Sequence, residues 1–131
     1  MLKALAERIS GAELEIMKTL WDAEDALPLT ELRRSLQQRL DWSDPTIKTL
    51  VRRLCEKGAL RQEKRNVYYY APAISREAYN EWAAADLVDR LFQGSARNLA
   101  AALVRSDGLT EEDLEELRQM FRRGDRNEQD P

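Results

Sequence analysis

Apolar residues recur with helical spacing in three stretches of the first half of the chain. After an irregular start, Ser10 and Glu13 have the spacing of a capping box and open the first helix. Thr30 is expected to be the N-cap of the second helix, and Asp44 the N-cap of the third, with Pro45 as its first helical residue. The core residues that these patterns predict are Ile16, Leu20, Leu32, Leu36, Ile47, Leu50, Val51, Leu54 and Leu60.

Two short runs, 60–64 and 67–71, follow the third helix and have the length of β-strands. Gly58 is expected to end the helix before them. Arg65 and Asn66 lie between the runs and predict a two-residue hairpin turn, because Asn tolerates a positive φ. Three helices joined by short loops and followed by a hairpin predict a winged helix-turn-helix domain.

Three further amphipathic stretches follow a joint at 73–75, over 76–92, over 96–105 and after Thr110. The fold class we expect is therefore mainly α with a small β-hairpin, a winged helix-turn-helix domain being followed by a C-terminal three-helix dimerisation region. The expected segments are a DNA-binding domain over 1–73, a helical dimerisation domain over 74–123 and a disordered tail over 124–131.

The last three helices carry more large apolar side chains than about 50 residues can bury in a core of their own. A second copy of the chain would cover them, so we expect a homodimer. The alternative is that these helices fold back onto their own winged helix. The residues expected in the dimer interface are Tyr79, Trp82, Leu87, Leu91, Phe92, Leu99, Leu103, Leu117 and Phe121.

The distribution of charge points to DNA although the net charge is −3. Residues 33–65 contain ten Lys and Arg against four Asp and Glu, whereas 73–131 contain eight against thirteen. Phosphate binding depends on the local patch more than on the total. The third helix has a cationic and hydroxylic face, which suits phosphates and base edges, made of Thr46, Lys48, Thr49, Arg52 and Arg53. The plainer alternative is a basic face that only meets solvent.

The sequence contains no histidine and a single cysteine, Cys55. The lack of histidine argues against most zinc sites and against Ser-His and Cys-His nucleophiles, so we expect no metal, no cofactor and no enzymatic activity. One cysteine cannot form an internal disulfide, which suits a reducing compartment. No run of about 18 apolar residues and no signal peptide is recognisable, so we expect a cytoplasmic protein without membrane insertion.

Several stretches together resemble the penicillinase-repressor family, BlaI/MecI/CopY, over about residues 9–121. They are ISGAELEIMKTLW (9–21), DWSDPTIKTLVRRLCEKGAL (41–60), VYYYAP (67–72), LFQGS (91–95) and LTEEDLEELRQM (109–120). The resemblance implies a cytoplasmic homodimeric repressor. It also implies binding to a palindromic operator in double-stranded DNA, often that of a β-lactamase or other resistance gene.

The resemblance also implies roles for single residues. Base-reading contacts in the major groove would come from Thr46, Lys48, Thr49 and Arg53. Backbone contacts would come from Trp42, Lys64 and Arg65, the last two being at the tip of the wing. The residues themselves add three candidates for phosphate contact: Ser10 in the first turn of a helix, Arg52 on the cationic face and Tyr68 on the wing.

Two departures from the family bear on the signal that would release such a repressor. The copper-sensing members carry paired C-terminal cysteines, which this chain lacks. Other members are cleaved at an Asn-Phe bond through a pathway that starts at a membrane-bound sensor protease. The matching position here is Ala102-Leu103, which leaves proteolytic control of this chain in question. The alternative to a repressor is a winged-helix module that binds proteins without specific DNA binding.

Overall fold

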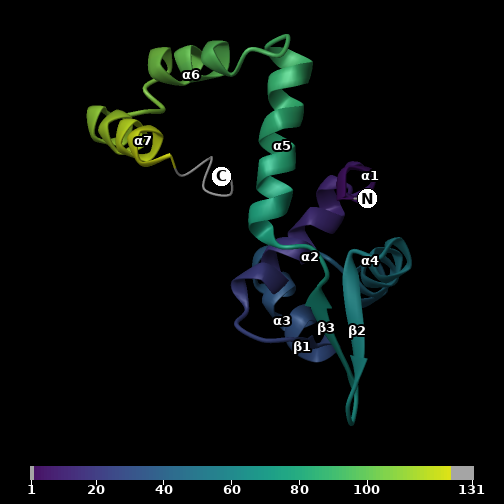
Figure 1. Cartoon of the computed structure of the whole chain (residues 1–131). Helices are drawn as coiled ribbons and strands as arrows, with labels where there is room; N and C mark the ends of the chain where they lie inside the picture. Colours follow the sequence, from purple (N-terminus) through teal and green to yellow (C-terminus); the bar gives the residue numbers. More distant parts are fainter. Residues whose placement is uncertain (1, 125–131) are drawn as a thin grey trace. The chain divides into compact units, whose positions relative to one another are not determined.

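The computed structural model of the chain describes residues 2–124 (Figure 1). Apart from Gly124, the tail predicted over 124–131 lies outside the described residues. The chain forms two compact units, the first ending at Ala84 and the second beginning at Ala85. The functional division at 73–74 stays a prediction.

Four helices of the first unit precede its hairpin, and three of them are the helices that the apolar pattern predicts. They are α1 (Leu2–Glu7), α2 (Gly11–Asp22), α3 (Leu29–Arg39) and α4 (Asp44–Lys57). The short helix α1 lies where the pattern predicts an irregular start. The helix packs against the first unit through Ala6, which is buried, and through Ile9, which is buried just after the helix ends.

Two of the expected helix N-caps are wrong, and the capping box of α2 is confirmed. In α2 the Ser10 hydroxyl accepts from the Glu13 backbone N–H, and the Glu13 carboxylate accepts from the Ser10 N–H. Helix α3 begins one residue before Thr30, with Pro28 as a cap that makes no side-chain hydrogen bond. Helix α4 is capped by Ser43, whose hydroxyl accepts from the Thr46 N–H, and Asp44 is its first residue.

The hairpin belongs to a three-stranded antiparallel sheet with the order β1-β3-β2. Its strands are β1 (Leu27–Pro28), β2 (Leu60–Lys64) and β3 (Tyr68–Pro72). The predicted two-residue turn is wrong, because Lys64 pairs with Tyr68 and leaves a three-residue loop. Asn66 does not have a positive φ; its side chain instead accepts a hydrogen bond from the Val67 N–H at 3.0 Å.

The core of the first unit lies between α2, α3, α4 and the sheet. All nine core residues predicted from the pattern are buried in it. The predicted core did not include Met17, Ala59 and Tyr70, which are also buried there.

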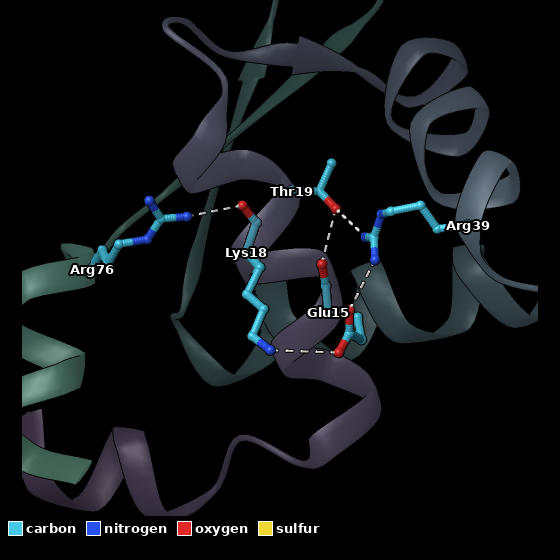
Figure 2. A network of polar contacts seen from close by, with 5 residues as sticks. All are labelled: Glu15, Lys18, Thr19, Arg39 and Arg76. Carbon is cyan, nitrogen blue, oxygen red and sulfur yellow. Dashed lines mark hydrogen bonds and ion pairs between the residues drawn. The ribbon is translucent and has the colours of Figure 1, made fainter. Parts of the chain in front are cut away.

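Helices α2 and α3 are also joined by polar contacts, which Figure 2 shows. The Arg39 guanidinium donates to Glu15 Oε1 at 3.3 Å and to Thr19 Oγ1 at 3.1 Å. Lys18 Nζ lies 3.6 Å from the other oxygen of Glu15. The same figure shows Arg76, the first residue of the next helix, donating to the Lys18 carbonyl.

The next helix, α5 (Arg76–Leu91), contributes residues to both units. Its first turns and the residues just before them contact α2. The indole of Trp21 donates to the Ile74 carbonyl at 2.9 Å, and its ring lies 5.6 Å from that of Tyr79. Arg76 pairs with Asp22 at 2.5 Å. The joint is therefore packed against the winged helix.

The second unit contains the end of α5 and the helices α6 (Ala96–Arg105) and α7 (Glu111–Arg123). Their predicted starts are confirmed: Ser95 caps α6, and Thr110 forms a capping box with Asp113. No residue among those described from 85 to 124 is buried. None of the described helices is long and apolar enough to cross a membrane.

Candidate nucleic-acid interface

Helix α4 separates its apolar and polar residues onto opposite faces. Ile47, Leu50, Val51 and Leu54 are buried in the core. The residues predicted to meet DNA lie on the other face: Thr46, Lys48, Arg52 and Arg53 are exposed and Thr49 is half-buried. Gly58 ends the helix with a φ of 87°, as predicted.

The two threonines and Arg53 form one stripe along α4, at positions i, i+3 and i+7. They line a shallow hollow of about 270 Å³ together with Pro45 and Leu50. A hollow with methyl groups in its wall and a guanidinium at its rim can accept both an apolar and a hydrogen-bonding part of a base edge.

Lys48 and Arg52 form a second stripe, which borders the sheet. They line a hollow of about 480 Å³ whose other wall includes Gln62 and Tyr70 of the hairpin. The Gln62 amide donates to the Tyr70 hydroxyl at 3.2 Å. The cationic side of α4 and one face of the hairpin are therefore neighbours on one surface.

The turn between α3 and α4 is held by side chains of both helices. The Gln37 amide donates to the Trp42 carbonyl at 3.0 Å and to Asp44 Oδ1 at 2.9 Å. Arg33 Nε lies 3.6 Å from the same Asp44 oxygen. Ser43, whose backbone is extended, caps α4, while the Asp44 carboxylate is held by Gln37 and Arg33. Sequence reasoning missed Gln37, because nothing in the local pattern links it to residues after the turn.

Trp42 is half-buried and packs against the core at this turn. Its predicted contact with the DNA backbone therefore rests on the part of its side chain that remains accessible.

Beneath the far end of α4 lies a buried ion pair that sequence reasoning did not identify. Glu13 is only 2% exposed, and its Oε1 lies 2.5 Å from Lys57 Nζ at the last residue of α4. Lys57 Nζ also donates to the Arg8 carbonyl at 2.6 Å. Burial alone raises the pKa of Glu13, but the hydrogen bonds from Lys57 and Ser10 outweigh it and the pKa lies below its usual value.

The same contacts occupy Ser10, a predicted phosphate contact. Ser10 is exposed, but its hydroxyl and its backbone N–H are both engaged with Glu13. Its predicted role in binding a phosphate stays a prediction.

The β2–β3 hairpin extends beyond the helices of its unit (Figure 1) and carries two cations near its tip. Lys64 Nζ lies 4.8 Å from the centre of the Tyr68 ring. The Arg65 guanidinium lies 4.2 Å from the centre of the Tyr69 ring and donates to Glu63 Oε1 at 2.7 Å. That hydrogen bond to Glu63 raises the pKa of Arg65.

The predicted dimer residues differ in how far their own unit covers them. Tyr79 packs against the core of the first unit, and Trp82 lies 5.7 Å from its ring. Leu87, Phe92 and Leu99 are half-buried. The most exposed members of the predicted set are Leu91, Leu103, Leu117 and Phe121, with Phe121 66% exposed.

Ala102-Leu103, the position that the resemblance suggests for a cleaved bond, lies within α6. Ala102 is half-buried and Leu103 is exposed. A protease would need α6 to open locally before it could reach the peptide bond.

The chain is similar to a known family and to known proteins. A family model described as Penicillinase repressor matches residues 9–123. The penicillinase repressor of Bacillus licheniformis is 32% identical over 115 residues, which cover 87% of this chain and 89% of that protein. The methicillin resistance regulatory protein MecI of Staphylococcus aureus (strain N315) is 27% identical over 114 residues, which cover 86% of this chain and 92% of that protein.

A solved structure is also similar to part of the chain. It is the solution structure of the DNA-binding domain of the repressor BlaI, with 38% sequence identity and a TM-score of 0.50. The similarity covers 55% of this chain and 88% of the solved domain.

Proposed function

The chain belongs to the penicillinase repressor family, and on that premise we propose that it is a sequence-specific DNA-binding transcriptional repressor that acts as a homodimer. The observation that carries the proposal is the exposed cationic face of α4 beside a hairpin with cations at its tip. The similarity of 55% of the chain to the solved DNA-binding domain of the repressor BlaI supports the proposal.

In this proposal α4 enters the major groove. The stripe of Thr46, Thr49 and Arg53 reads base edges together with Lys48, because hydroxyl, methyl and cationic groups match the donors, acceptors and methyl groups displayed there. Backbone contacts come from Ser10, Trp42, Arg52, Lys64 and Tyr68, whereas Arg65, which was predicted with them, is hydrogen-bonded to Glu63. Those contacts supply most of the affinity and position the helix, but they do not read sequence.

The homodimer is supported by the apolar surface that the second unit does not bury within itself. Leu91 and Leu117 are 61% and 45% exposed. A second copy would bury this surface by a two-fold symmetric contact and would present two α4 helices to a symmetric site.

The names of the relatives suggest what such a repressor would control. Genes for antibiotic resistance are candidate targets, because the relatives are named for penicillinase and methicillin resistance. Release through a membrane-bound sensor protease is a further expectation, for which α6 would be the segment that opens. A repressor acts on the chromosome, so the proposal places the protein in the cytoplasm.

The test is selection of DNA by the purified protein from fragments of the genome that encodes it, followed by titration of the retained sequence. We expect a recurrent two-fold symmetric site, bound with a Kd of about 10⁻⁸–10⁻¹¹ M at physiological salt. The affinity should fall steeply as salt increases. No enriched sequence, together with an affinity that salt does not change, would instead favour the protein-interaction module.

A further inference from the structure

The two faces of the β2–β3 hairpin differ in charge pairing. Side chains of directly paired residues lie on the same face of a sheet, and successive residues alternate between the faces. Lys64 pairs with Tyr68, and Glu63 pairs with Tyr69, so these two pairs lie on opposite faces. Arg65 stacks on Tyr69 and therefore lies on the Glu63 face.

The Lys64 face is the one that borders α4. Gln62 and Tyr70 lie two positions along the strands from Lys64 and Tyr68, so they share that face. They also form the wall opposite Arg52 in the hollow beside α4. The salt bridges among the described residues include none to Lys64, whose ammonium group is available to a phosphate.

The Glu63 face borders a different hollow, of about 620 Å³, which is also lined by Trp21 and Asp25. Arg65 donates to Glu63 Oε1 through Nε at 3.1 Å and through its terminal nitrogen at 2.7 Å. Two donors of its guanidinium thus hold one carboxylate oxygen, and the ring of Tyr69 covers its plane. Arg65 is held on the side of the hairpin away from α4.

We propose that Glu63 withholds Arg65 from the DNA, so that Lys64 is the cation through which the tip of the wing meets the phosphates. The inference rests on the proposed DNA-binding function and adds a residue that limits affinity. Glu63 and a phosphate compete for one guanidinium, because each accepts the same two N–H groups. As long as Glu63 holds Arg65, the wing neutralises one phosphate fewer than its sequence suggests.

The experiment measures binding of the full chain to a short mixed-sequence duplex by fluorescence anisotropy over a series of salt concentrations. The variants are Glu63→Gln, Arg65→Ala and the double variant. Glu63→Gln keeps the shape of the side chain and removes its charge. Glu24→Gln is the matched control, because Glu24 lines the same hollow and has no salt bridge among the described residues.

Glu63→Gln should tighten binding by about two- to fivefold for each bound chain, the range expected when an exposed ion pair no longer competes. It should also steepen the plot of log K against log salt by about 0.9 per chain, because one more phosphate is neutralised. Arg65→Ala should leave the affinity and the slope of the parent unchanged. In the Arg65→Ala background, Glu63→Gln should no longer steepen the slope.

Three results would overturn the inference while leaving DNA binding in place. Glu63→Gln could leave the slope unchanged, it could act equally with and without Arg65, or Arg65→Ala could weaken the parent strongly. An effect of Glu24→Gln equal to that of Glu63→Gln would also overturn it, since the loss of any nearby charge would then suffice. A parent chain that shows no salt-dependent binding would overturn the proposed function and this inference together.

Discussion

At the scale of single residues, the exposed side chains of α4 divide into two stripes with different surroundings. Thr46, Thr49 and Arg53 line a hollow on the helix itself, whereas Lys48 and Arg52 face the hairpin. Arg52 also lies 3.9 Å from Glu56, a contact between exposed groups that contributes little to stability. The stripe with Arg53 is the better placed to read bases.

Arg53→Ala should therefore weaken binding to the selected operator by about 1–3 kcal/mol, the contribution of one good base contact. Gel-shift titration measures the loss, and sedimentation and thermal unfolding should match those of the parent. Lys18→Ala removes a cation from the exposed surface of α2 and is the control. An operator affinity unchanged by Arg53→Ala would remove this residue from the interface.

The buried pair of Glu13 and Lys57 is also a residue-scale matter, because one carboxylate joins the start of α2 to the end of α4. Glu13→Gln should lower the free energy of unfolding at neutral pH by about 1.5–3 kcal/mol, the usual contribution of a hydrogen bond to a charged group. Glu15→Gln is the control: Glu15 is more exposed and its pairs lie on the surface, so the loss should be smaller.

The pH dependence of this difference follows from the lowered pKa of folded Glu13. The stabilisation is fully present above the unfolded pKa of a glutamate, about 4.3, and is lost as the pH falls through the lower pKa of the folded protein. Urea unfolding of parent and Glu13→Gln at several pH values should therefore converge in acid. A difference in stability that stays constant with pH would contradict this role.

At the scale of elements, the first turns of α5 are structurally part of the winged helix. Trp21 of α2 donates to the Ile74 carbonyl just before α5 and lies against Tyr79 of α5. Helix α2 and the start of α5 are therefore in contact within the first unit. The compact unit accordingly ends at Ala84 rather than at the hairpin.

A chain that ends after Pro72 should consequently be less stable to urea than one that ends after Ala84, by about 1–3 kcal/mol. This is the sum expected from one hydrogen bond and one aromatic pair. Both fragments should sediment as monomers, and both should bind a half-site more weakly than the full chain binds the whole site. Equal unfolding midpoints for the two fragments would show that α5 contributes nothing to the winged helix.

At the scale of the whole molecule, the proposed function depends on a second copy that covers the apolar residues of the second unit. Substituting Trp82 would test this poorly, because Trp82 is half-buried and packs beside Tyr79 of its own chain. Leu117 is better suited, since α7 leaves it 45% exposed.

Leu117→Glu should dissociate the proposed dimer, because it places a charge in an apolar contact. Operator affinity should fall by about 100-fold or more, since two half-sites are no longer bound by linked copies. Gln119→Glu adds the same charge to α7 two residues away and should leave the dimer intact. Sedimentation equilibrium reports both masses, and a Leu117→Glu variant of unaltered mass would count against this interface.

Much of the fold and of the candidate site was predictable. The starts of α6 and α7 and the cationic face of α4 follow from patterns within one or two helical turns. The strand β1 was not predictable, because two residues have no detectable period and become a strand only by pairing with β3. The turn of the hairpin was also wrongly predicted: Lys64 pairs with Tyr68, and Asn66 accepts a hydrogen bond from the Val67 N–H instead of adopting the expected positive φ.

Periodicity and charge pattern are properties of neighbouring residues, and they were enough to identify the winged helix, its buried stripe and its exposed cations. The partner of each charged group depends on distances between elements far apart along the chain. Glu13 and Lys57 are 44 positions apart, and no spacing rule joins them. Glu63 and Arg65 are close in sequence, and the strand register places both on the face of the hairpin away from Lys64. Folding thus decides which cations are free to meet a phosphate, because a carboxylate already within hydrogen-bond distance competes for the same donors.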